Sequence, residues 1–279
     1  MITLVEDLNT PVRYLKNVGP ARAKLLEKLG IHTVQDLLTH FPRRYEDRRT
    51  IIPLNRLRLG EKVVIKGQII SLEEKKPRPN LHLLVALLSD GQGEAQAVFF
   101  NQSYLAKKLV PRTTLIVSGK VDYFIGCARI NVEEFEILEE DDLNLTAGRI
   151  VPFYPLTSGL SQRVMRTLVH QALARYGPLI EDLLPPETLH KYNLLPAPQA
   201  IHYMHFPPDP ESQARARYRL AFEELLHFEI GLLLSKRKYR QQLPGVAHTG
   251  GNEKLKQFYS SLPFELTAAQ RRVIREILL

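Results

Sequence analysis

Two aromatic residues four positions apart, Phe100 and Tyr104, are the side chains best suited to bind a nucleobase. The alternating residues Ala95, Ala97 and Phe99 precede them, so if Phe99 faces a core, Phe100 points to the opposite face. Tyr104 opens the next segment, close enough to form a joint aromatic surface. Stacking contributes roughly 1–3 kcal/mol per base and tolerates any base. Burial of both rings in a second small core is the structural alternative.

A glycine turn, Asn17–Ala21, leads into a predicted helix over Pro20–Leu29 and is a candidate phosphate site. Gly19 permits close approach, and the N–H groups at a helix start suit an anion. Arg22 and Lys24 would add positive charge. The arrangement resembles the helix-hairpin-helix motif, which grips nucleic-acid backbone without reading bases. A tight turn within a helical bundle would have the same sequence pattern.

Four arginines fall within seven residues, at Arg43, Arg44, Arg48 and Arg49. Clustered guanidinium groups could clamp phosphates, and each such contact makes binding more dependent on salt. Two acidic residues lie among them, so internal ion pairs would absorb part of the charge. We expect a structural role for at least two of the arginines, and Arg43 and Arg44 are the candidates for phosphate contact.

No catalytic or metal centre is predicted. The Gly119-Lys120 pair is followed by Val121, so the sequence has no phosphate loop of the GxxxxGK[ST] type. The single cysteine, Cys127, excludes a Cys-rich zinc site and an internal disulfide, and it fits a reducing compartment, with the cytoplasm as the default. No apolar run is long enough to span a membrane.

Charge favours a polyanionic partner. The formal net charge is +8, and residues 1–60 hold eleven Lys and Arg against six Asp and Glu, whereas residues 61–150 hold eleven against thirteen. A localised phosphate-facing patch would account for this asymmetry. Lysines and arginines that only solubilise the surface are the alternative.

The segment that must position Phe100 and Tyr104 is rich in β-forming residues. A helical pattern, Gln102–Leu109, separates the third predicted strand from the fourth, and a charged loop, Glu73–Asn80, follows the first. The predicted strands are Glu61–Leu72, Leu81–Ser89, Glu94–Phe100, Thr114–Tyr123 and Ala128–Leu138. Three strands, a helix and two strands is the element order of an OB-fold.

Helical segments flank this predicted barrel. Thr33 caps a helix over Val34–His40, and residues 146–210 carry ten of the nineteen prolines with one clear helix, Ser161–Tyr176. Apolar residues at spacings of three and four predict a long helix over 211–241, and Thr267 caps another helix within Pro263–Leu279. The fold class predicted is α+β: a five-stranded OB-fold barrel flanked by helical segments, with a long linker helix.

Several segments carry a family resemblance. In order over about 250 residues, they are Val18–Pro20, His32–Leu38, Pro42–Arg48, Tyr154–Gln162, Leu183–Glu187, Ile201–His202, His205–Pro207, Arg219–Leu226 and Leu262–Gln270. Together they resemble the N-terminal half of the RecG family, bacterial ATP-dependent DNA helicases that remodel stalled replication forks.

The resemblance implies a function. In the family, the OB-fold is a wedge that helps split strands at a fork, and its two stacking aromatics match Phe100 and Tyr104. Phe264 and Gln270 match an adenine-recognition stretch. The phosphate loop would follow Leu279, so we expect no cofactor and no ATP hydrolysis in this chain, and ATP and Mg²⁺ in a longer parent. The implied partners are forks and Holliday junctions, with a single-stranded DNA-binding protein as a further candidate and a monomeric state.

The expected domains follow from these features. They are a helical, helix-hairpin-helix-like segment (1–55), the OB-fold wedge (56–145), a mixed helical segment (146–210), a long linker helix (211–250) and the beginning of a motor domain (251–279). Two other functions remain open. A general single-stranded nucleic-acid-binding module explains the charge and barrel equally well, and a protein-docking platform would use the same barrel face for a peptide.

Overall fold

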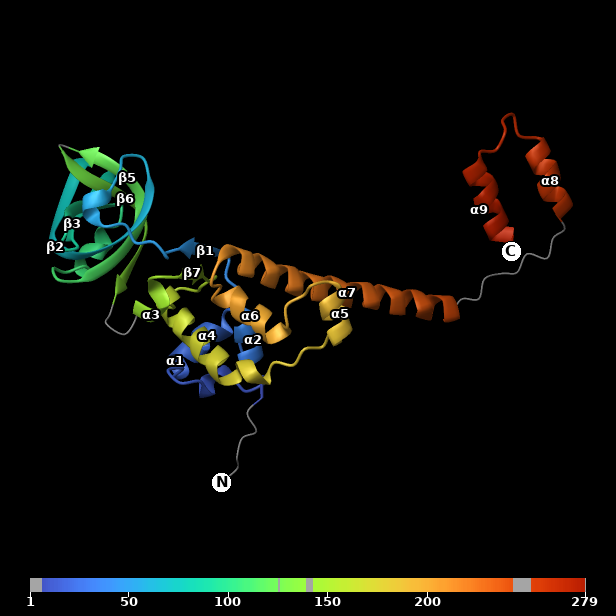
Figure 1. The fold of residues 1–279 in the computed structure, drawn as a ribbon, viewed down its shortest axis with the longest axis horizontal. Coiled ribbons are helices and arrows are strands. Elements are labelled where there is room, and N and C mark those ends of the chain that lie inside the picture. Colours follow the sequence, from blue (N-terminus) through green and yellow to red (C-terminus); the bar gives the residue numbers. More distant parts are fainter. Residues whose placement is uncertain (1–6, 125, 139–142, 243–251, 279) are drawn as a thin grey trace, which may run out of the picture. The chain divides into compact units, whose positions relative to one another are not determined.

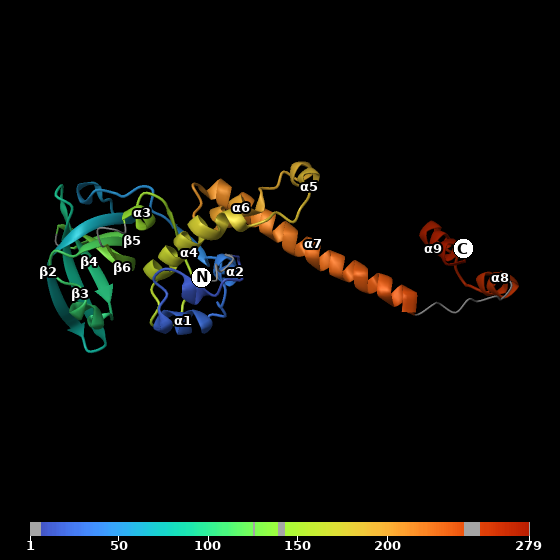
Figure 2. The same ribbon diagram turned by 90° about the horizontal axis from the view of Figure 1, so that it is seen from below.

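The computed structural model describes residues 7–124, 126–138, 143–242 and 252–278. The chain forms two compact units, Met1–Glu224 and Leu225–Leu279. Within the first unit, a β-barrel lies beside a helical base (Figure 1, Figure 2).

The barrel closes in the strand order β2-β3-β4-β6-β5. Its strands are β2 (Lys62–Arg78), β3 (Leu81–Ser89), β4 (Glu94–Phe100), β5 (Thr114–Phe124) and β6 (Cys127–Leu138). β4 and β6 pair in parallel, and the other neighbours pair antiparallel. A short 3-10 helix, η3 (Ser103–Lys107), connects β4 to β5. The predicted OB-fold is therefore confirmed.

Two predicted elements of the barrel were wrong in extent. The expected charged loop, Glu73–Asn80, is mostly strand, because β2 continues to Arg78 and pairs with β3 across a register shift. The side chains at this end of β2 are exposed on both faces of the strand, so their charged groups stay in solvent and are not penalised by burial. The helix expected over Gln102–Leu109 is only the five-residue η3, since a single turn suffices to bury Leu105.

Alternating residues fill the barrel interior. Phe99 is fully buried and meets Phe135 edge to face, with ring centroids 5.1 Å apart. Gly119 allows β5 and β6 to approach closely, because a Cβ there would lie 2.2 Å from the Asn131 carbonyl oxygen. Packing thus explains the glycine of the Gly-Lys pair.

The helical base gathers segments from both sides of the barrel sequence. It includes η1 (Val12–Tyr14), α1 (Pro20–Glu27), α2 (Val34–Thr39), α3 (Leu143–Thr146), α4 (Gln162–Tyr176), η5 (Gly177–Leu179), α5 (Pro186–Lys191) and α6 (Ala197–His205). One hydrophobic cluster contains residues of η1, α1, α2 and α4. Thr33 caps α2, as the sequence predicts, and forms a capping box with Asp36, while Ser161 caps α4.

Prolines start helices here more often than they interrupt them. Residues 146–210 were expected to contain one clear helix, but α5 and α6 also lie there. α5 and α6 each have proline in the first two positions, where the missing N–H costs no hydrogen bond.

Two strands that the sequence analysis missed cross the boundary between barrel and base. β1 (Arg44–Asp47) pairs antiparallel with β7 (Ile150–Phe153), and η2 (Leu54–Arg56) leads from β1 into the barrel. The chain therefore enters the barrel after β1 and returns from it before β7, and these two paired strands form one ribbon between the base and the barrel.

A partly buried carboxylate with two fully buried arginine partners connects the barrel to this base. Glu136, on β6, accepts a hydrogen bond from the Arg48 guanidinium at 3.0 Å and pairs with Arg166 of α4. Both arginine side chains are 1% exposed. Arg48 also pairs with Glu46 at 2.7 Å. These charges are compensated by one another, so their geometry fixes how β6 sits against the base.

His205 is buried where α6 meets the rest of the base. Its Nε2 lies 2.9 Å from the Leu38 carbonyl oxygen, which can only accept, so Nε2 carries the proton. Nδ1 then accepts from the Tyr154 hydroxyl at 3.0 Å. Burial lowers the pKa of His205 to about 4 and raises the pKa of Tyr154 well above its usual value.

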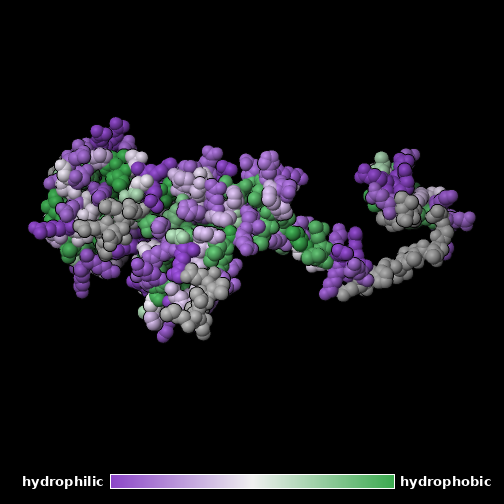
Figure 3. Space-filling model, turned by 60° about the horizontal axis from the view of Figure 1, so that its bottom comes forward, coloured by the Kyte–Doolittle hydropathy of each residue, from purple (hydrophilic) through white to green (hydrophobic). Residues whose placement is uncertain are grey.

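The last described segments are helical. α7 (Pro210–Gln242) confirms the predicted long helix, α9 (Ala268–Leu278) begins after the Thr267 cap, and α8 (Asn252–Ser260) was not predicted. The apolar residues of α7 from Leu225 onward, among them Phe228 and Leu232, are exposed (Figure 3). Among the described residues, no helix combines the length and apolarity needed to cross a membrane.

Replacing Glu136 with Gln should lower the free energy of unfolding by about 1–3 kcal/mol, because the buried Arg48 and Arg166 each lose one carboxylate partner, although Arg48 keeps Glu46. Urea denaturation measures this change. Glu133→Gln, on the same strand, is the matched control, since Glu133 pairs with Lys62 at a surface where the two side chains are 49% and 66% exposed. Equal effects of the two substitutions would contradict the role of Glu136.

Stability should also fall as the pH drops from 6.5 toward 4. The folded state holds His205 neutral with a pKa of about 4 against 6.5 when unfolded, so protons bind the unfolded state preferentially. Holding His205 neutral therefore contributes roughly 3 kcal/mol to the free energy of unfolding above pH 6.5, and this contribution is lost by about pH 4. His205→Gln should flatten this part of the stability curve, whereas His190→Gln, on an exposed position of α5, should not. An unchanged slope in His205→Gln would refute the assignment.

Candidate nucleic-acid interface

The end of β4 separates one buried aromatic ring from one exposed ring. Phe99 is fully buried, whereas the adjacent Phe100 is 44% exposed. Asn101 then turns the chain with φ 54°, in the left-handed region that asparagine tolerates. Its backbone N–H donates to the His82 carbonyl at 2.8 Å, and its side-chain oxygen accepts from His82 N–H at 3.0 Å. The predicted opposite orientation of Phe99 and Phe100 is confirmed, and the turn holds it.

η3 presents the second ring. Leu105 is buried against the barrel core, which leaves the neighbouring Tyr104 60% exposed. The Lys108 ammonium lies 6.0 Å from the Tyr104 ring centroid, at the limit of a cation–π contact. Both candidate rings are thus exposed and are not buried in a second core.

Two hollows adjoin where the barrel meets the helical base. One, of about 440 Å³, is lined by Tyr104 and Lys108 on the barrel side and by Arg163 of α4. The other, of about 520 Å³, is lined by Arg43, Arg44 and Tyr154. They share the wall residues Glu134, Phe153 and Gln162, and we call the two together the β6–α4 groove. Tyr104 and the two predicted arginines are therefore brought to one groove.

The four clustered arginines divide into two roles. Arg48 is buried in the Glu136 network, and Arg49 pairs with Asp47 at 2.6 Å, which supports the expected structural role for two of them. Hydrogen bonds from Arg49 lower the pKa of Asp47. Arg43 and Arg44 are exposed, and Arg44 pairs with Glu134 and lies 4.0 Å above the Phe153 ring.

The glycine turn lies apart from these hollows, since none of its residues lines them. Gly19 is the N-cap of α1, and a side chain there would meet nothing within 4 Å, so the turn is open to a ligand. Arg22 and Lys24 are exposed, and Arg22 donates to the Asn17 carbonyl oxygen at 2.6 Å. Part of the hydrogen-bonding capacity of Arg22 is thereby used to close the turn.

The sequence profile of the RecG wedge domain matches residues 11–175, which include the barrel, the β1–β7 ribbon and α4. The chain belongs to the RecG wedge domain family.

Longer relatives extend this similarity beyond the wedge. The chain is 40% identical over 274 residues to the ATP-dependent DNA helicase RecG of Thermotoga maritima, covering 97% of this chain and 34% of that protein. It is 37% identical over 282 residues to the ATP-dependent DNA helicase RecG of Streptococcus pneumoniae, and the match covers 98% of this chain and 39% of that protein. The chain therefore spans little more than a third of these curated relatives. A solved structure of RecG bound to a three-way DNA junction matches 99% of the chain with 38% identity and a TM-score of 0.66, and the chain covers 38% of that protein.

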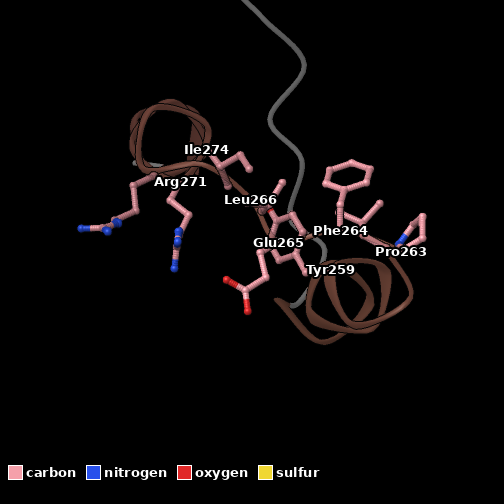
Figure 4. Close-up of a pocket in the computed structure, with 9 residues that line it drawn as sticks. Tyr259, Pro263, Phe264, Glu265, Leu266, Arg271 and Ile274 are labelled. Carbon is pink, nitrogen blue, oxygen red and sulfur yellow. The ribbon is translucent and has the colours of Figure 1, made fainter.

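The two residues that the RecG resemblance assigned to adenine lie on the second unit. Phe264 is 58% exposed and lines a hollow of about 840 Å³ between α8 and α9, together with Tyr259 and Arg271 (Figure 4). Gln270 does not line this hollow. Its amide oxygen accepts from Thr267 N–H at 2.9 Å, so Gln270 completes the cap of α9.

Several residues of the β6–α4 groove were not predicted from the sequence. Lys108 follows Tyr104 by one helical turn, a spacing that could have indicated it. Glu134, Phe153 and Arg163 come from three separate elements, and no local pattern marks them. Among the described residues, no group of three or more His, Cys, Asp or Glu side chains could hold a metal ion.

Replacing Phe100 or Tyr104 with Ala should change the free energy of unfolding by only about 0.5 kcal/mol, because both rings are exposed. Phe99→Ala should lower it by about 3–5 kcal/mol, since Phe99 fills the barrel core. Thermal and urea unfolding of the three variants provide the comparison. A large loss in Phe100→Ala or Tyr104→Ala would mark that ring as a core residue instead.

Proposed function

We propose that this chain binds branched DNA where the barrel meets the helical base. The observation that carries the proposal is the β6–α4 groove, in which the exposed Tyr104 lines one hollow and Arg43 and Arg44 line the adjoining one. An aromatic face suits an unpaired base and an arginine suits a phosphate, and a branch point offers both within one site. The RecG proteins that share this fold include one solved on a three-way DNA junction.

Phe100 and Tyr104 would stack on the bases that unpair at the branch. Their rings are preset, since the Asn101 turn and the burial of Leu105 hold the backbone on which they stand. Stacking needs no particular base, which suits a protein that acts at forks of any sequence. Lys108, beside Tyr104, would add a phosphate contact.

Arg43 and Arg44 would hold the phosphates of an arm. The Arg44–Glu134 pair is solvent-exposed, with side chains 48% and 40% accessible, so its rearrangement toward a phosphate costs little. Gly19, Arg22 and Lys24 at the start of α1 would contact duplex backbone outside the groove. This assignment rests on the open N-terminal turn and the exposed charges.

We further propose that the longer protein is an ATP-dependent DNA helicase, as the names of its relatives support, and that it remodels stalled forks and Holliday junctions in recombination and repair. The exposed Phe264 ring and the unengaged Gln270 amide nitrogen fit a purine base. ATP and Mg²⁺ would bind with a phosphate loop that this sequence does not contain. The division into five segments (1–55, 56–145, 146–210, 211–250 and 251–279), a cytoplasmic location, a monomeric state and contact with a single-stranded DNA-binding protein remain predictions.

Fork binding provides the test. In fluorescence anisotropy at fixed salt, the chain should bind a three-way fork more tightly than linear duplex of equal length. Phe100→Ala and Tyr104→Ala should each weaken fork binding by about 1–3 kcal/mol, the contribution of one stacked base. Tyr14→Ala removes an equally exposed ring from η1, outside the groove, and should have no effect.

Each other outcome identifies a different function. Equal affinity for fork and linear duplex would contradict junction binding. Efficient competition by poly-dT against the fork would indicate a general single-strand module. Binding that survives high salt would indicate a protein-docking platform, because phosphate contacts weaken steeply as salt rises.

A further inference from the structure

The outer face of the barrel carries a second arginine–aromatic site. Because Phe99 and the alternate residues before it fill the core, Gln96 and Phe100 of β4 point outward. β6 pairs with β4 so that Arg129 lies opposite Gln96, and β5 pairs with β6 so that Asp122 lies opposite Arg129. Phe124 follows Asp122 by two residues, so it shares this outer face.

Phe124 and Arg129 form a preset pair. Phe124 is 48% exposed, and the Arg129 guanidinium carbon lies 4.2 Å from its ring centroid. Arg129 Nε is buried without a hydrogen-bond partner, and no ion pair to Arg129 occurs among the described residues. A guanidinium that stacks on an exposed ring, with no ion pair among the described residues, suits a base and its phosphate.

The hairpin that carries this pair is anchored by its other face. The Tyr123 hydroxyl donates to the Leu57 carbonyl oxygen at 3.1 Å, which fastens the end of β5 to the segment before the barrel. Tyr123 therefore explains how the hairpin is held. The ring of Phe124 lies on the opposite face and takes no part in that anchor.

Phe100 and Phe124 stand at opposite ends of one surface. Phe124 of β5 pairs with Cys127 of β6. The parallel register of β6 with β4 places Cys127 level with Glu94, at the start of β4. Glu94 precedes Phe100 by six residues along β4. At about 3.4 Å per strand residue, this is roughly 20 Å along the face. Asn131, the exposed Lys120 and the buried Val98 lie between them, and the acids Glu94 and Asp122 lie near the Phe124 end of this face. The span fits an OB barrel site of about 4–16 nucleotides.

We propose that Phe124 and Arg129 form a second stacking position for the unpaired strand that leaves the branch point. The strand would pass from Phe100 across the outer face of β4, β6 and β5 to Phe124 at the end of β5. This inference rests on the proposed function, because it extends the ligand bound at Phe100. The ligand class is unpaired DNA of any sequence.

A fork with a single-stranded arm of ten nucleotides tests the path. A fluorescent base analogue, 2-aminopurine, is placed at each arm position in turn, and its quenching by the chain is recorded. Two quenched positions should appear, at least four nucleotides apart. Phe124→Ala should remove only the position farther from the branch, Phe124→Tyr should keep it, and Phe100→Ala should remove only the nearer one.

Affinity gives an independent readout. Phe124→Ala should weaken binding of the long-armed fork roughly five- to a hundredfold, and should leave a fork with a two-nucleotide arm unchanged. Arg129→Gln should weaken the long-armed fork and reduce the salt dependence by about one phosphate contact. Tyr14→Ala is the matched control, since Arg13 lies 4.9 Å from that exposed ring, away from the barrel.

The outcomes separate this inference from the proposed function. If Phe100→Ala weakens fork binding and Phe124→Ala does not, the second position is wrong and junction binding stands. A single quenched position, or a distal position that persists in Phe124→Ala, would also overturn it. If neither substitution affects fork binding, both the second position and the proposed function fail.

Discussion

The structure depends on one mostly buried carboxylate, that of Glu136. This glutamate of the barrel is held between Arg48, which follows β1, and Arg166 of α4, and Glu46 is a second carboxylate on Arg48. Such a network adds little net stability, yet removal of one member leaves uncompensated charge and is costly. The consequence is geometric: the barrel has one favourable position on the base, and the walls of the β6–α4 groove are fixed by it.

The barrel uses neighbouring residues for opposite purposes. Phe99 fills the core while Phe100 is displayed, Leu105 is buried while Tyr104 is displayed, and Tyr123 anchors a hairpin whose Phe124 is displayed. In each pair the inward residue fixes the backbone and so sets the ring beside it. Rings fixed in this way lose little conformational entropy when a base stacks on them, which favours binding of any sequence.

Local patterns predicted most of the fold. Runs of β-forming residues between turns indicated the five strands, alternation in the third indicated the opposite directions of Phe99 and Phe100, and the Thr33 cap marked the start of α2. Interactions between distant segments escaped prediction. Arg48 and Glu136 are 88 residues apart, so nothing local distinguishes Arg48 from Arg44. The β1–β7 ribbon and the charged end of β2 were missed for the same reason, because pairing partners decide them.

The central claim is that the placement of the barrel on its base creates the preference for a branch, whereas single-strand stacking belongs to the barrel alone. The most direct test compares Glu136→Gln with the unaltered chain, under conditions where circular dichroism shows both folded, for binding to a three-way fork and to dT oligomers. We predict that Glu136→Gln loses its preference for the fork and keeps its affinity for single strands. An unchanged fork preference, or an equal loss for both ligands, would contradict this account.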